Sequence, residues 1–180
     1  DFSPPTLLSF SSITPDDSYG PGAPITVIAT YNESLQAASS LTVVLDTGAA
    51  VLLDTVSTST ISGVYTVGAL GSGENTSDLT VSSVSSENVT DLYSNSTTNS
   101  SVPAAPNNLR DSSNIVVDTS APTLVEVTPV SDPTSDNTPQ YTFSSGEVGT
   151  ISISGGCGSV TTAAGSGNNE ITLDSDNAGT

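Results

Sequence analysis

PITVIATY, at residues 24–31, is the clearest secondary-structure signal in this chain. Apolar Ile25, Val27 and Ala29 alternate with β-branched residues, and the turn-forming residues YGPG at 19–22 come just before them. Alternation with a period of two predicts a strand with one buried face, because successive side chains of a strand point to opposite faces. The region around these residues is therefore expected to be a β-domain.

Further short apolar runs surround this strand, and each is bounded by Gly, Asn, Asp or Ser. No helical periodicity is found between them. The runs predict strands at residues 41–45, 51–56, 64–67, 79–84 and 115–117. About seven short strands in roughly 117 residues are typical of an immunoglobulin-like β-sandwich, with a β-barrel as the main alternative.

The start of the chain is repeated later in the sequence. DFSPPTLL, at residues 1–8, recurs as DTSAPTLV at residues 118–125. The shift of about 117 residues corresponds to one β-domain and is too long for a solenoid repeat. We therefore predict an all-β fold of tandem immunoglobulin-like β-sandwiches, with one domain at residues 1–118 and a second at residues 119–180.

The second domain is expected to be incomplete within this chain. Its apolar runs predict strands at residues 124–128, 140–144, 150–154 and 170–173. Four strands leave edges and apolar faces exposed, so either the chain continues beyond Thr180 or a strand from another molecule completes the fold. We favour continuation, because NAGT at residues 177–180 is typical of a turn before another strand.

The composition argues against several classes of function. The chain has no His, Lys, Trp or Met, and it has a single Arg110 and a single Cys157. It therefore lacks most side chains that act as general bases or nucleophiles, and we do not expect an enzyme. A net charge of −18 argues against nucleic acid and anionic membrane surfaces as partners, and no apolar run is long enough for membrane insertion. The acidic balance suits a secreted protein that binds divalent cations, or a surface that is simply well solvated.

Longer strings of the sequence resemble a known family. SITPDDSYGPGAPITVIATYNESL, LTVVLDTGAAVLL and NIVVDTSAPT in the first domain are similar to bacterial immunoglobulin-like repeats of large cell-surface proteins and adhesins. TPQYTFSSGEVGTISISGGCGSV and GNNEITLDSDNAGT in the second domain resemble another repeat type of the same proteins. The resemblance implies an extracellular location at the cell surface and a role in extending and displaying other domains, and it reveals little about any bound partner.

The resemblance also bears on Cys157. In the repeat type that the second domain resembles, a second Cys commonly follows shortly after the NNxITL strand. This implies that the partner of Cys157 lies beyond Thr180. The sequence by itself leaves two other outcomes open, a disulfide to another molecule or a free thiol.

Acidic and amide side chains in the predicted loops are candidate ligands for Ca²⁺, which prefers oxygen ligands. The candidates are Asp17 with its neighbour Asp16, Glu33, Asp91, Asn95 and Asp118. The resemblance implies that Glu33 and the turn with Asp91 lie near one end of the domain, and we expect Ca²⁺ bound by Glu33, Asp91 and Asp118 to stiffen the junction. The alternative is that these residues form ordinary turns through local hydrogen bonds. An ordinary loop is also the expectation for Asp132, Asp136 and Asn137.

These observations favour a structural function, as a repeat module of a bacterial surface protein or filament that acts as a rigid spacer or assembly unit. The short link TSAP at residues 119–122 supports this, because Pro122 restricts the backbone. The expected partners are neighbouring repeats or identical subunits, with strand exchange into the second domain as one route of assembly. The alternative is an adhesin that binds a host protein or glycan, although the loops lack the aromatic and Arg residues typical of binding hot spots.

Overall fold

The chain divides into two compact units, residues 1–120 and 121–180, so the boundary falls after Ser120 instead of after Asp118. The computed structural model describes residues 2–97, 100–132 and 134–174. Within these ranges it has fifteen strands and one short helix, which confirms the predicted all-β class. In the same ranges no helix is long and apolar enough to cross a membrane.

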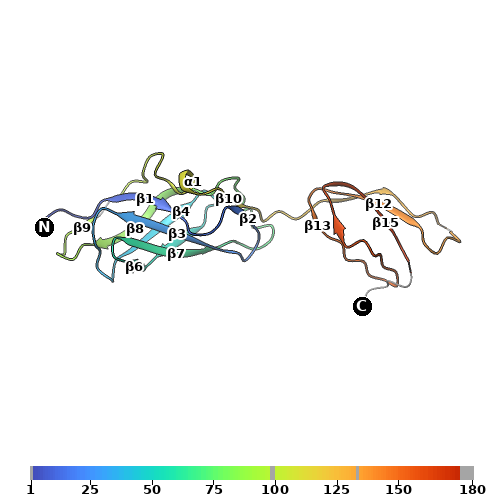
Figure 1. The fold of residues 1–180 in the computed structure, drawn as a ribbon, viewed down its shortest axis with the longest axis horizontal. Helices are drawn as coiled ribbons and strands as arrows, with labels where there is room; N and C mark the ends of the chain where they lie inside the picture. The colour runs from blue at the N-terminus through green and yellow to red at the C-terminus, as the bar shows by residue number, and fades with distance from the viewer. Residues whose placement is uncertain (1, 98–99, 133, 175–180) are drawn as a thin grey trace. The chain divides into compact units, whose positions relative to one another are not determined.

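Unit 1, residues 1–120, contains two antiparallel sheets (Figure 1). The first runs in the order β1 (Leu7–Ser11), β3 (Pro24–Tyr31), β7 (Thr60–Thr66) and β6 (Thr55–Ser57). The second runs in the order β5 (Ala50–Leu53), β4 (Ser40–Leu45), β8 (Val81–Thr90) and β9 (Ser96–Thr97). Both sheets contribute to one hydrophobic core, which is the arrangement of a β-sandwich.

The alternation in PITVIATY produces the core-facing side of β3. Ile25, Val27 and Ala29 are fully buried, whereas Thr26 and Ile28 are only half-buried. The strand β4 buries its own alternate residues in the same core: Leu41, Val43 and Leu45. Burying a Val, Leu or Ile side chain contributes about 1.5–3 kcal/mol, so these alternating positions account for much of the stability of unit 1.

Three strand predictions in unit 1 need correction. The strand predicted at residues 64–67 is the end of β7, which begins at Thr60 and ends at Thr66. The run at residues 51–56 is divided between β5 and β6, because the chain passes from one sheet to the other at Asp54. The strand predicted at residues 79–84 begins at Val81 and continues to Thr90, well past its predicted end. The second half of β8 is polar and has no apolar alternation that would predict a strand. Backbone pairing with β4 and β9 keeps it extended.

A two-stranded parallel sheet connects the two ends of the unit 1 sequence. β2 (Asp17–Tyr19) pairs in parallel with β10 (Ile115–Val117). Ile115 and Val117 are both buried in the core. The strand predicted at residues 115–117 is confirmed, whereas β2 has no apolar alternation by which the sequence would reveal it.

The helix α1 (Leu109–Ser112) contradicts the expectation that the chain has no helix. Asn108 precedes it, and its side-chain oxygen accepts a hydrogen bond from the Leu109 N–H at 2.7 Å. The Asp111 carboxylate accepts a bond from the Asn108 N–H at 2.9 Å, which completes a capping box. Leu109 is fully buried, so one buried side chain and two capping residues stabilise this single turn. A helix of one turn is too short to show a helical periodicity in the sequence.

Unit 2, residues 121–180, has one three-stranded antiparallel sheet and a short hairpin. The sheet runs in the order β11 (Leu124–Thr128), β12 (Gln140–Ser145) and β15 (Gly167–Thr172), and the hairpin pairs β13 (Gly149–Thr150) with β14 (Ala163–Ala164). The strand predicted at residues 150–154 is wrong beyond its first residue. Residues 151–154 alternate Ile and Ser, as a strand would. Among the described residues, however, only one backbone hydrogen bond extends the pairing beyond β13, from the Ile151 N–H to the Thr162 carbonyl at 2.9 Å.

The sheet of unit 2 has the order of three strands of unit 1. β11, β12 and β15 follow one another as β1, β3 and β7 do. The first strand of each set also has a shift in register against the second. Among the described residues of unit 2, no counterpart of the sheet β5-β4-β8-β9 covers this sheet.

Candidate functional site

Asp91 lies in the turn between β8 and β9 and is completely buried. Its Oδ1 accepts hydrogen bonds from the backbone N–H groups of Tyr93 (2.8 Å) and Asn95 (2.7 Å). Its Oδ2 accepts a bond from the side-chain amide of Asn95, also at 2.7 Å. The three bonds engage both carboxylate oxygens and fix the turn of the β8–β9 hairpin.

The electrostatics of Asp91 follow from these bonds. Burial opposes ionisation, but the hydrogen bonds from Asn95 and Tyr93 outweigh burial and hold the pKa of the Asp91 carboxyl below its usual value. Asn95 directs its amide nitrogen at Asp91, whereas a calcium ligand would be an oxygen. The structure thus brings Asp91 and Asn95 together, in the geometry of a side-chain-stabilised turn.

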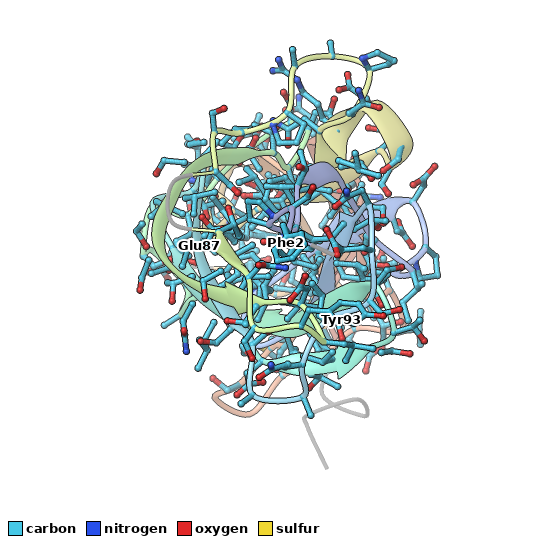
Figure 2. The ribbon with its side chains drawn as sticks, turned by 90° about the vertical axis from the view of Figure 1, so that its left-hand side faces the viewer. Phe2, Glu87 and Tyr93 are labelled. Carbon is cyan, nitrogen blue, oxygen red and sulfur yellow. The ribbon has the colours of Figure 1, made fainter. Side chains whose placement is uncertain are left out.

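Glu33 follows β3 at the same end of unit 1. Together with Ser34, Leu92 and Tyr93 it lines a cavity of about 260 Å³. Figure 2 looks onto this end and labels Tyr93 with Phe2 and Glu87. Glu33 and the Asp91 turn therefore occupy neighbouring segments, although the buried Asp91 carboxylate does not line the cavity.

Asp17 and Asp118 lie at the opposite end of unit 1, on β2 and immediately after β10. Both are exposed, and the Oδ1 of each accepts a local backbone bond, from Ser18 (2.8 Å) and Ser120 (2.9 Å) respectively. The eight residues of β3 separate this end from Glu33. At about 3.3 Å per residue, that distance is about 25 Å.

The five predicted calcium ligands therefore do not form one site within unit 1. Glu33, Asp91 and Asp118 lie too far apart to bind a single ion. In residues 2–97, 100–132 and 134–174 no three acidic or cysteine side chains are arranged to hold a metal ion. Asp16 accepts a backbone bond from Asn114, which is distant in sequence and precedes β10, and Asp136 accepts a local one from Thr138. Calcium binding stays a prediction.

Glu87, on β8, is a connecting residue that the sequence pattern does not reveal. Its Oε1 accepts bonds from the Tyr31 hydroxyl (3.2 Å) and the Ser100 hydroxyl (2.7 Å), and its Oε2 accepts one from the Ser100 N–H (2.8 Å). Burial and then the charge of Glu87 raise the pKa of Tyr31 well above its usual value. Glu87 thereby ties the segment at Ser100 to the two sheets.

Asp78 interacts electrostatically with the single arginine, Arg110, and with three other carboxylates. Asp78 has one carboxylate oxygen that is buried without a hydrogen-bond partner in the described part of the chain. Burial raises the pKa of Asp78, and the positive charge of Arg110 opposes this rise. Asp46 accepts bonds from the Thr76 hydroxyl (2.6 Å) and the Thr80 N–H (3.1 Å), so it holds the turn at residues 76–80.

The last residues of unit 1 are fastened to one of its loops. Thr119 is completely buried, and its N–H (2.6 Å) and hydroxyl (3.1 Å) both donate to the Asn75 side-chain oxygen. Its carbonyl accepts a bond from the Gly71 N–H at 2.6 Å. In unit 2, the Thr123 carbonyl accepts a bond from the Gly146 N–H at 2.9 Å. Only two residues, 121 and 122, lie between Ser120 and Thr123.

Unit 2 carries an apolar groove of about 490 Å³. Its lining comes from β11, β12, β15, both strands of the β13–β14 pair and the segment that follows β13, and it includes Leu124, Tyr141, Phe143, Ile151 and Ile171. The rings of Tyr141 and Phe143 stack with their centroids 6.3 Å apart. Among the described residues, Glu126 is the only charged one in the lining. Alternate aromatic residues on β12 are the sequence signal for the groove, but the segments that line it with them are visible only in the structure.

Cys157 is half-buried and is not part of a disulfide. A scan against protein-family models gives no match, and a search of curated proteins finds no similar sequence. The resemblance to bacterial immunoglobulin-like repeats and the pairing of Cys157 implied by it therefore stay predictions.

Proposed function

We propose that this chain is a structural repeat module of a bacterial cell-surface protein or filament, built from immunoglobulin-like domains and acting as a spacer between its neighbours. The observation that carries the proposal is the fastening of Thr119 to Asn75 and Gly71. A buried, hydrogen-bonded terminus leaves little free chain between successive units.

The sequence of the link supports the same role. Pro122 fixes its own φ and restricts the residue before it, so the two residues between Ser120 and Thr123 have few accessible conformations. A spacer requires such a link, because a long flexible linker would let successive units reorient freely. Neighbouring repeats are the partners that this role requires.

Distance measurement between spin labels tests the proposal. One label is placed on native Cys157 and the other on Ser82→Cys, an exposed position on β8. We expect a narrow distance distribution, and insertion of Gly-Ser-Gly-Ser after Ser120 should broaden it by about twofold or more, since flexible Gly/Ser chains behave as random coils. Equal widths for the native and the lengthened link would contradict the spacer role.

Calcium stiffening is tested in the same samples. If Ca²⁺ binds at either end of unit 1, adding it should raise the melting temperature of the chain, because a ligand that binds only the folded state stabilises that state. It should also narrow the label distribution. An unchanged melting temperature and width after chelation would remove calcium from the proposed role.

A further inference from the structure

We propose that the groove of unit 2 binds an extended peptide strand of another protein, which pairs with the outer edge of β11 and places apolar side chains into the groove at every second position. The partner segment is uncharged or basic. This inference goes beyond the spacer role and does not depend on it.

The outer edge of β11 is open. β11 pairs with β12 on one side, and within the described residues no backbone hydrogen bond is formed on its other side. In unit 1 the equivalent strand β1 is covered, because the Phe10 N–H donates to the Asn107 carbonyl at 2.9 Å and α1 packs against the strand. An open edge offers unpaired N–H and C=O groups to an added strand.

The groove extends to this edge through Leu124. In the register of β11 with β12, Leu124 pairs with Ser145 and Glu126 pairs with Phe143, so these residues share the face that lines the groove. Val125 pairs with Ser144, so its side chain points to the opposite face. Leu124 remains 69% exposed. A strand added beside β11 would cover Leu124 with the alternate side chains that it directs to the groove face.

The equivalent face of unit 1 shows which side chains fit. There β4 supplies Leu41, Val43 and Leu45 at alternate positions, opposite the buried residues of β3. In unit 2 the corresponding β12 residues Tyr141 and Phe143 face the groove, and in place of a four-stranded sheet only the short β13–β14 pair and residues 151–153 line it with them among the described residues. A peptide that alternates apolar and polar residues satisfies the edge with its backbone and the groove with its side chains.

Charge selects the kind of partner. Glu126 is the single charged residue of the groove. The sequence of unit 2 has seven acidic residues and no Lys or Arg, and the whole chain has a net charge of −18. Two copies of this chain therefore repel each other, whereas a neutral or basic segment of a different protein does not. This argues against the predicted exchange of strands between identical subunits.

The first experiment uses the full chain and a synthetic peptide, SLTVVLKK, which joins residues 40–45 of this chain to two lysines. The control peptide SSTSVSKK replaces the three alternate apolar residues by Ser. Calorimetric titration should show binding of SLTVVLKK at least about tenfold tighter than binding of the control. Hydrogen exchange of the outer-edge amides of β11 should slow when SLTVVLKK binds, since added ladder bonds protect them.

A matched pair of variants locates the site. Leu124→Asp and Val160→Asp both replace an exposed aliphatic residue, 69% and 77% exposed, by the same charged residue, and of the two only Leu124 lines the groove. Because both positions are exposed, both variants should fold, which circular dichroism checks. Leu124→Asp should weaken binding of SLTVVLKK at least about tenfold, and Val160→Asp by less than about twofold.

Four results would overturn the inference. Three are equal affinity for the two peptides, equal effects of the two variants, and no binding of SLTVVLKK at millimolar concentration. The fourth is self-association of the chain that Leu124→Asp abolishes, which would assign the groove to a second copy. None of these results changes the label distances that test the spacer role.

Discussion

Units 1 and 2 contain the same order of three strands, but among the described residues only unit 1 closes it into a core. In unit 1 the sheet β1-β3-β7-β6 shares a core with β5-β4-β8-β9. In unit 2 the sheet β11-β12-β15 faces an open apolar groove within the described residues. The difference shows that strand order and register form from local pairing, whereas the burial that stabilises them depends on a second layer.

Substitution of one phenylalanine in each unit should give the largest contrast. Phe10 is 1% exposed in the core of unit 1, and Phe143 is half-buried beside the groove of unit 2. Phe10→Ala should cost about 3–5 kcal/mol of unfolding free energy, because it removes buried surface and leaves a cavity. Phe143→Ala should cost about 1 kcal/mol or less, since its site is already open to water. Urea unfolding monitored by NMR signals of each unit measures the loss of unfolding free energy in both variants. Equal losses would mean that the groove around Phe143 is closed in solution.

Two glycines offer a smaller contrast between the units. A Cβ atom on Gly63, in β7, would overlap the carbonyl oxygen of Leu52 and would lie 2.9 Å from Leu53 Cδ2. Gly63→Ala should therefore destabilise unit 1 by about 1–3 kcal/mol through overpacking. Gly149, in β13, has no atom within 4 Å of its added Cβ and does not have a positive φ. Gly149→Ala should be neutral or stabilise unit 2 by up to about 1 kcal/mol. A neutral Gly63→Ala would show that β5 can move away from β7.

The strands of both units were predictable where side chains alternate. The period of two in residues 24–31 predicts β3, and the run at 115–117 predicts β10. The same rule fails at residues 151–154, because alternation makes a strand only where a neighbouring strand supplies hydrogen bonds. It also fails at Asp54, where the change of sheet depends on contacts distant in sequence.

The candidate sites were less predictable than the strands. The sequence indicates that Asp91 and Asn95 belong to one turn, but it does not show that turn bonds occupy the carboxylate, since this depends on backbone conformation. It does not separate Asp118 from Glu33 either, because their distance follows from the direction of β3. The groove is still harder to predict, since its lining brings Tyr141 and Phe143 together with residues of β11, β13, β14 and β15 that are distant in sequence.

Acidification should weaken unit 1 through Asp91. Its lowered pKa means that the ionised carboxylate stabilises the fold above the unfolded-state pKa of about 3.9, and that this stability is lost as the pH falls through the lower folded-state pKa. Asp91→Asn should lower the melting temperature of unit 1 at neutral pH, and the difference from the unchanged chain should shrink below about pH 4. Thermal unfolding between neutral and acidic pH measures this. Asp17→Asn, at an exposed position, is the control, and the same loss in both variants would contradict the role of the Asp91 bonds.

The smallest expected effect concerns Tyr65, on β7 of unit 1. Burial, and then a hydrogen bond from its hydroxyl to Glu74 Oε2 (2.6 Å), raise the pKa of Tyr65 to about 12. The raised pKa contributes stability that is fully present below the unfolded-state pKa of about 10 and is lost as the pH rises through about 12. Glu74→Gln removes the charged acceptor but leaves the burial, so the pKa of Tyr65 should fall toward 10.0 without reaching it. Ultraviolet titration of tyrosinate measures the change. An unchanged pKa of Tyr65 in Glu74→Gln would mean that burial alone raises it.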